Sequence, residues 1–340
     1  MATDFGIDLG TARTIIYSGA SPVLDEPSVV AVETHTGDPV SYGKDAYPMI
    51  GRTPDRITAI TPIERGAIAN YDVAEMMMRH FIGKISDNKM LKARVIVATP
   101  SGITVVQQRS IMNVCEAAGA RDVCLIEAQM AAAIGLSMDF TIPRGSIIVD
   151  IGAGTCDVAV LSMGGIAQCE SAPIAGIDFN EAIARYVKRE YNVLIGPHTA
   201  EKIKVEIGCV IKRPLLLTMT CKGRNQFTGL PQAFEINTDE VREACGDTAI
   251  HVCKAIAGVI EKTPPEMVGD ISGDGLLLTG GGALLHGLPE FIAEYTGLKV
   301  ERVADPISCV ARGTGKAFKN FGLLKQGDYR FRTLQDMEIG

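Results

Sequence analysis

Two stretches of the sequence place aspartate, glycine and threonine between apolar runs, in a pattern that could bind an anion. They are FGIDLGTARTIIY at 5–17 and IIVDIGAGTCDVAVLS at 147–162. Each pattern predicts a strand, a tight turn and a second strand, and the backbone N–H groups of such a turn form a concave surface that suits a phosphate. We match Gly10 with Gly154, expecting positive φ at both, and Thr11 with Thr155 as additional hydroxyl donors.

Asp8 and Asp150 end the first strand of each stretch, beside the expected anion. Two carboxylates next to a phosphate chain would repel it unless a cation lay between them. Mg²⁺ fits this position because it takes oxygen ligands and usually keeps several waters. The two copies together therefore predict one site for Mg²⁺ and a polyphosphate. A single copy would be weak evidence, since a glycine-bearing β-hairpin without a ligand has the same pattern.

A third glycine turn lies in LLLTGGGALL, after a predicted buried strand and before a predicted helix. Gly280, Gly281 and Gly282 would let a ligand approach the backbone at a helix N-terminus, although a packing turn is the alternative. Glu201 and Lys204 lie three residues apart, on one face of a predicted helix. They could hydrogen-bond a ribose and a base, or form a surface ion pair.

Strands and helices alternate after both copies of the pattern. The chain has 340 residues and 46% hydrophobic content, enough for two domains with cores. The order predicts α/β domains with mixed sheets that face each other across a cleft. We expect helices at 72–86, 104–120, 178–192 and 197–210. Asp72 is the expected N-cap of the first helix, and 49–70 is expected to be loop.

Charge and cysteine content exclude several classes of protein. The net charge of −7 opposes a general affinity for nucleic acid, which needs a basic surface. Nine cysteines without a CxxC pair favour buried thiols in a reducing cytosol over a metal site. The first strand begins by residue 5, which leaves no room for a signal peptide. We expect no transmembrane helix, because no apolar run reaches about 18 residues.

These residues resemble the MreB/Mbl family of bacterial actin homologues, within the superfamily of actin, sugar kinases and seventy-kilodalton chaperones. The resemblance covers nearly the whole chain, including GIDLGTARTIIY, AGARDVCLIEAQMAAAIG, LIGPHTAEKIKVEIG and LTGGGALLHGLPEFIAEYTGL. It implies an α/β, actin-like fold with two duplicated RNase H-like domains around a nucleotide cleft. The halves would be 1–143, with a small insert near 33–68, and 144–325, with an insert near 181–247; a polar tail would occupy 326–340.

The resemblance also implies ATP as the ligand, with Asp8 and Asp150 holding Mg²⁺ through water. The residues that would contact ATP are Thr11, Ala12 and Arg13 in the first turn, Ala153, Gly154 and Thr155 in the second, Glu201, Lys202, Ile203 and Lys204 near the nucleoside, and Gly280, Gly281, Gly282 and Ala283 near the adenosine.

The chain departs from the family pattern at several of these positions. Arg13 stands where the family usually has Asn, and it could contact phosphate or point away. The family reads GGGTTE where this chain has Cys156 and Asp157 in GAGTCD, and Ile177 replaces an Asp.

The fourth departure bears on catalysis. The family reads IEEPMAAAIG, and its second Glu is thought to position the attacking water; here IEAQMAAAIG places Ala128 at that position. We therefore expect ATP binding but only weak, slow ATPase activity. Gln129, Glu127 and Asp157 are the candidates to take over the missing role.

The resemblance further implies filaments of identical subunits that organise cell-wall synthesis and determine rod shape. The protein would be cytoplasmic and peripherally associated with the inner face of the membrane, with membrane proteins of the cell-wall elongation machinery as partners. Met90 and Leu91 would dip into the bilayer while Lys89, Lys92 and Arg94 face anionic lipid. An ordinary solvated turn is the alternative for this loop.

Two other functions found in the superfamily fit this sequence less well. An ATP-dependent small-molecule kinase of the sugar-kinase type would need a carboxylate base beside the acceptor hydroxyl, and no such feature is recognisable. A chaperone ATPase would need a substrate domain after the nucleotide-binding half, whereas this sequence ends in LLKQGDYRFRTLQDMEIG.

Overall fold

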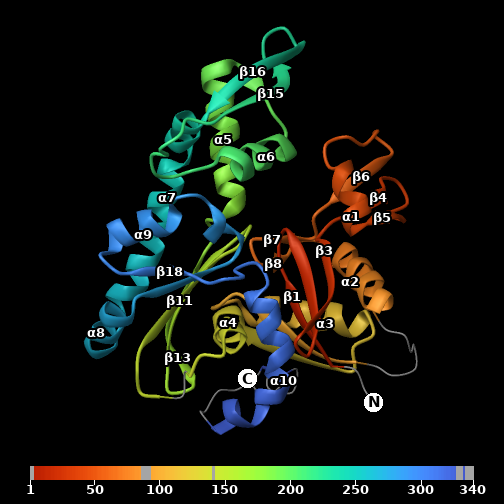
Figure 1. Cartoon of the computed structure of the whole chain (residues 1–340). Coiled ribbons are helices and arrows are strands. Elements are labelled where there is room, and N and C mark those ends of the chain that lie inside the picture. The colour runs from red at the N-terminus through yellow and green to blue at the C-terminus, as the bar shows by residue number, and fades with distance from the viewer. Residues whose placement is uncertain (1–3, 86–92, 140–141, 327–331, 334–340) are drawn as a thin grey trace.

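Two halves, each built on a five-stranded mixed sheet, make up the molecule in the computed structural model (Figure 1), which describes residues 4–85, 93–139, 142–326 and 332–333. The first sheet has the order β10-β9-β1-β2-β3, with β1 (Asp4–Leu9), β2 (Arg13–Ser18), β3 (Ser21–Pro27), β9 (Arg94–Thr99) and β10 (Asp122–Glu127). The second has the order β13-β12-β11-β17-β18, with β11 (Ser146–Ile151), β12 (Cys156–Ser162), β13 (Gly165–Ala172), β17 (Leu276–Thr279) and β18 (Val300–Arg302).

The two sheets have the same topology, which confirms the duplication inferred from sequence. In each half the first three strands are antiparallel neighbours, and the last two strands run parallel to the first. Strands β1 and β11 also share one burial pattern. Only their first and fifth residues keep partial exposure, and the fifth residues are Asp8 and Asp150. An otherwise buried strand thus presents one carboxylate near its end in each half.

Alternate residues of the central strands pack into different cores, because successive side chains of a strand point to opposite faces. In β11, Ile147 and Val149 pack in an outer core with α7 (Thr238–Glu261), while Ile148 packs in a central core with α4 (Ala128–Leu136). Helices α8 (Pro265–Asp274) and α9 (Leu288–Thr296) also cover the second sheet, and α2 (Tyr71–Ile85) and α3 (Val105–Ala117) cover the outer face of the first.

Helices α4 and α10 (Cys309–Gln326) lie against each other between the two sheets (Figure 1). Each follows the fifth strand of its own half, so the pair is itself part of the duplication. The helices approach so closely that a Cβ on Gly313 would lie 1.7 Å from the Ala131 carbonyl oxygen, and one on Gly135 would lie 2.3 Å from that of Cys309. Although α10 falls in the range assigned to the second half, it also packs on β1, β2 and β9 of the first sheet.

Each half carries an insert after its third strand, and both inserts lie at the same end of the molecule (Figure 1). The first contains β4 (Val30–Glu33), β5 (Pro39–Tyr42), α1 (Gly43–Ala46), the 3₁₀ helix η1 (Tyr47–Met49), β6 (Ile57–Ile60) and the hairpin β7 (Ile63–Glu64) and β8 (Ala67–Ile68). The second contains α5 (Gly176–Tyr191), β14 (Val193–Leu194), α6 (Pro197–Ile207), β15 (Thr218–Asn225) and β16 (Pro231–Asn237).

The prediction that 49–70 is loop was wrong in part, because three short strands lie within it. Strands of two to four residues are too short to show periodicity in a sequence. All nine cysteines lie in the described ranges and stand outside any disulfide, and seven of them are buried, as the composition predicted. In the described ranges, no helix combines the length and the apolar character needed to cross a bilayer.

The predicted helices all form, with ends that differ from expectation by up to three residues. The N-cap predicted for α2 was wrong. The helix begins at Tyr71, and the backbone N–H of Val73 donates to Asn70 Oδ1 at 3.1 Å. Asn70 is therefore the cap, and Asp72 lies in the first turn, where its charge complements the helix dipole.

This assignment predicts different effects for two neighbouring substitutions. Asn70→Ala should lower the free energy of unfolding by about 1 kcal/mol, because the Val73 N–H in the first turn of the helix loses its acceptor. Asp72→Ala should cost only about 0.3–1 kcal/mol, the usual size of a dipole interaction. Urea unfolding followed by circular dichroism compares the two variants. A larger loss for Asp72→Ala would restore Asp72 as the cap.

Candidate functional site

The turns of the duplicated hairpins have the same hydrogen bond. The Gly10 N–H donates to the Arg13 carbonyl at 3.0 Å, and the Gly152 N–H donates to the Thr155 carbonyl at 2.9 Å. Gly152 is therefore the structural counterpart of Gly10. The match predicted from the sequence aligned the two threonines, which do not occupy equivalent positions in the two turns.

Matching Gly10 with Gly154 and Thr11 with Thr155 was thus wrong by two residues. Neither Gly10 nor Gly154 has a positive φ, so the reason predicted for these glycines was also wrong. Close approach explains Gly154, since a Cβ there would lie 2.6 Å from Thr11 Oγ1 and 2.9 Å from the Cα of Arg65. The turn of the second half therefore touches the turn of the first, as the duplicated pattern predicted.

Three carboxylates meet beside these turns. Burial raises the pKa of Asp8 to about 7, and the charge of Asp157 adds to the rise. Burial, followed by the charges of Asp157 and Asp8, raises the pKa of Asp150 well above its ordinary value. Burial raises the pKa of Asp157 to about 6, against hydrogen bonds from Ser171 and Thr155 that lower it. Asp157 lies opposite Asp150 in the β11–β12 register, so the three charges repel one another.

Two of these carboxylates have buried oxygens without hydrogen-bond partners, Oδ1 of Asp150 and Oδ1 of Asp157. Such oxygens are costly in a protein interior unless a donor or a cation satisfies them. Oxygen donors of this kind suit Mg²⁺, which would neutralise the repulsion. Among the described residues, no group of three or more acidic, histidine or cysteine side chains forms a ready-made metal site.

The third glycine turn packs against the second copy of the pattern. Gly280 has a φ of +83°, and a Cβ there would lie 2.5 Å from Asp150 Oδ1. The expectation that these glycines open an α-helix was wrong, because Gly281–Leu284 form the 3₁₀ helix η2 and α9 begins only at Leu288. Gly281 borders open space, and Ala283 is buried.

Helix α6 lies beside the second turn through two of its predicted residues. Lys204 Nζ donates to Glu201 at 2.8 Å and to the Gly176 carbonyl at 2.9 Å, and Asn180 donates to Glu201 at 2.6 Å. Gly176, at the start of α5, in turn donates to the Gly152 carbonyl at 3.1 Å. Glu201 and Lys204 thus share one face and are linked by an ion pair, as their spacing allowed.

The other predicted contact residues are differently engaged. Lys202 forms an exposed ion pair with Glu206 at 3.8 Å, and Ile203 is fully buried. Arg13 pairs with Asp25 on β3 at 2.6 Å, half exposed at the surface.

Among the backbone groups, the Ala12 carbonyl accepts the N–H of Ser28 at 3.0 Å, and that of Ala153 accepts the N–H of Ile177 at 2.8 Å. Thr155 Oγ1 donates to Asp157 Oδ2 at 2.7 Å, which leaves the other oxygen of that carboxylate unpaired.

The three candidates for orienting water differ in whether a side-chain donor or acceptor lacks a hydrogen-bond partner. Gln129 is fully buried; its Oε1 accepts from Ser101 at 2.8 Å, and its Nε2 has no partner. Glu127 is paired with Arg332 at 3.4 Å. Asp157 retains an unpaired oxygen. One donor and one acceptor are therefore available, on Gln129 and Asp157, while Ala128 is buried at the start of α4 and offers no polar side chain.

A contact between the two inserts escaped the sequence analysis. His198 Nε2 lies 3.0 Å from the Tyr47 carbonyl oxygen, and the two rings meet edge to face at 4.6 Å. The charge of Glu201 reaches this contact, because it adds to the rise that burial causes in the Tyr47 pKa. Partners 151 residues apart leave no local signal in a single sequence.

Comparisons with known proteins find similarity to one family over nearly the whole chain. The MreB/Mbl protein family model matches residues 2–326. The cell shape-determining protein MreB of Escherichia coli (strain K12) is 44% identical over 325 residues, 94% of each chain. The cell shape-determining protein Mbl of Bacillus subtilis (strain 168) is 41% identical over 325 residues, 95% of this chain and 98% of that one.

Among solved structures, MreB5 of Spiroplasma citri bound to ADP superposes with a TM-score of 0.89 at 32% identity, covering 97% of this chain and 99% of that chain. The MamK double helical filament matches with a TM-score of 0.79 at 18% identity, covering 94% and 99%, and shows the likeness of fold alone.

The contact between the turns predicts unequal effects of two alanine substitutions. Gly154→Ala should lower the free energy of unfolding by about 1–3 kcal/mol, because the new methyl group overlaps Thr11 and Arg65. Gly152→Ala is the matched control, since the nearest atom to its Cβ would be the Thr155 carbonyl oxygen at 3.6 Å. Urea unfolding of the nucleotide-free protein measures both. Equal losses would mean that the turns are not in tight contact.

Proposed function

Because the chain belongs to the MreB/Mbl family of actin-like, cell shape-determining proteins, we propose that it binds Mg²⁺–ATP between its halves and assembles with copies of itself into filaments. The observation that carries the proposal is the meeting of the two turns beside three carboxylates, two of which have an unpaired oxygen. Support comes from MreB5, whose structures are bound to ADP and to AMPPNP. Family membership favours this function over a small-molecule kinase.

In this site, different residues would contact the metal ion, the phosphates and the nucleoside. Asp8 and Asp150 would hold Mg²⁺ through water, and the ion would neutralise phosphate charge. Backbone N–H groups and Thr11 would contact phosphate from the first turn, while Ala153 and Gly154 would do so from the second. Glu201 and Lys204 would contact the nucleoside. The glycine turn at 280–282 would lie on the adenosine side, where Gly281 borders open space.

The biological role proposed is that of the family: filaments at the inner face of the cytoplasmic membrane that organise cell-wall synthesis and so determine rod shape. Sedimentation with Mg²⁺–ATP tests the assembly step. We expect filaments to pellet with Mg²⁺–ATP and to remain in the supernatant when the nucleotide is omitted. Identical sedimentation under both conditions would contradict nucleotide-dependent assembly.

Hydrolysis is proposed to be slow because Ala128 offers no group to orient water. The Nε2 of Gln129 and the Oδ1 of Asp157 are unpaired, so we propose that they jointly hold the attacking water, one as donor and one as acceptor. Glu127, which is engaged by Arg332, would act less directly.

Two substitutions test this division of roles. Ala128→Glu should raise the rate of phosphate release by about tenfold or more, because a carboxylate returns to the water-orienting position. Gln129→Leu should lower the residual rate by a similar factor, since it removes the free N–H at nearly constant volume. Phosphate release is measured beside light scattering, so that loss of assembly is not mistaken for loss of hydrolysis. If Gln129→Leu leaves the rate of phosphate release unchanged, Gln129 does not hold the attacking water.

Membrane association is proposed through Met90 and Leu91, which lie outside the described residues. Burying two such side chains would contribute only about 3–5 kcal/mol, marginal for one subunit and adequate for a filament with many copies. Met90→Ser with Leu91→Ser should therefore abolish pelleting with anionic liposomes while leaving assembly without lipid intact. Undiminished liposome binding by the double variant would refute this contact.

A further inference from the structure

The tip of the β7–β8 hairpin has an unusual residue for its conformation. Arg65 and Gly66 connect the two strands, with φ angles of +47° and +75°. Two-residue hairpin turns with positive φ at both positions strongly favour Asn, Asp or Gly at the first of them. A long side chain in this conformation is unfavourable, and such residues cluster at functional sites. What the Arg65 side chain contacts is therefore informative.

The guanidinium of Arg65 reaches from the first half of the molecule to the second. It donates from Nη1 to the Pro173 carbonyl oxygen, and its Nη2 lies 3.2 Å from Asp178 Oδ1. The Asp178 carboxylate is held in place, because its Oδ2 accepts the N–H of Ala175 at 2.8 Å at the start of α5. One side chain thus makes a hydrogen bond and an ion pair across the boundary between the halves.

This bridge lies directly beside the two phosphate-binding turns. The Gly66 N–H donates to Thr11 Oγ1 at 3.3 Å in the first turn. In the second turn, a Cβ on Gly154 would lie 3.0 Å from the Arg65 nitrogen, and a Cβ on Gly66 would lie 3.4 Å from Cγ2 of Thr155. The hairpin tip therefore contacts both turns, at the point where the proposed polyphosphate would be enclosed.

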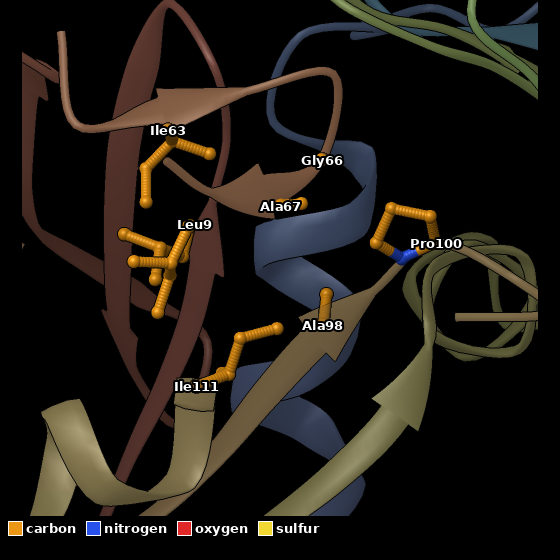
Figure 2. Close-up of a pocket in the computed structure, with 8 residues that line it drawn as sticks. Leu9, Ile63, Gly66, Ala67, Ala98, Pro100 and Ile111 are labelled. Carbon is orange, nitrogen blue, oxygen red and sulfur yellow. The ribbon is translucent and has the colours of Figure 1, made fainter. Parts of the chain in front are cut away.

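The hairpin is seated firmly on the first half. Figure 2 shows Ile63 and Ala67 of the hairpin above Leu9, Ala98 and Ile111, which come from β1, β9 and α3. The cavity that remains between them is only about 10 Å³, at the lower limit for a single water. With so little free space beneath it, the hairpin moves with the first half. Separation of the halves must then break the bonds that Arg65 makes to the second.

We propose that Arg65 is a latch that holds the two halves together over bound nucleotide, and that breaking its bonds to Pro173 and Asp178 is part of nucleotide release. The inference rests on the proposed function, since it takes a nucleotide in the cleft as given. Arg65 is a positioning residue here, and no contact between its side chain and the nucleotide is invoked. Its side chain is 44% exposed, so the ion pair responds to salt.

Arg65→Asn tests the latch without disturbing the turn, because Asn is favoured at this position of the hairpin. Release of a fluorescent ATP analogue from the full chain, chased with unlabelled ATP, should become roughly three- to tenfold faster, the scale of an exposed ion pair with a charge-assisted hydrogen bond. The melting temperature of the nucleotide-free variant should stay the same or rise. Release from the wild type should accelerate with salt more than release from the variant.

Two further variants separate a latch from a general surface effect. Asp178→Asn keeps an acceptor for the Ala175 N–H but loses the charge, and its effect should not add to that of Arg65→Asn, because both remove one interaction. Arg144→Ala removes a comparably exposed pair with Asp274 that lies within the second half, and it should leave release unchanged.

The outcomes distinguish the latch from the proposed function. Release from Arg65→Asn at the wild-type rate, with the same salt dependence, would overturn the latch while nucleotide binding stood. Fully additive effects of Arg65→Asn and Asp178→Asn would also overturn it. A wild-type chain that does not bind the analogue would overturn the proposed function, and the latch with it.

Discussion

The central physical constraint on the structure is the mutual repulsion of three carboxylates that are largely shielded from water. Asp8 comes from the first half, and Asp150 and Asp157 come from the second. The duplication places Asp8 and Asp150 at equivalent positions of β1 and β11, and the β11–β12 register places Asp157 opposite Asp150. Two of their oxygens have no partner, and the pKa values of all three are raised. A cation and an anion bound together would resolve this repulsion, so the ligand-free arrangement is costly and ligand binding is favoured.

The rest of the fold holds the two halves at a distance where one ligand can reach both. At the base, α4 and α10 are in such close contact that neither Gly135 nor Gly313 could carry a side chain without a shift. At the opposite end, the contacts between the halves include those of Arg65 with Asp178 and of Tyr47 with His198. With close backbone packing at one end and exposed polar contacts at the other, bound nucleotide would set the angle between the halves, and that angle would set compatibility with a filament.

Much of this arrangement could be predicted from sequence because it depends on short-range patterns of residue type. The repeated aspartate and glycine gave the duplication, the mixed sheets and the meeting of the turns. The exact match of the turns could not be read, since Thr155 resembles Thr11 in type but is the counterpart of Arg13. The strands within 49–70 were too short for periodicity. Arg65 and His198 act on partners more than 100 residues away, and a single sequence has no signal for such contacts.

The central claim is that one Mg²⁺–nucleotide is bound by both halves at once, and calorimetry tests it most directly. Titration of Mg²⁺–ATP into the wild type, Asp8→Asn and Asp150→Asn tests one carboxylate from each half. Neither substitution should unfold the protein, because burial disfavours the ionised form of both carboxyls and Asn is uncharged. The account predicts one nucleotide per chain and an affinity that falls about tenfold or more in both variants, as expected when a charged contact to the bound ion is lost. Unchanged affinity in either variant would show that the nucleotide is bound by one half alone.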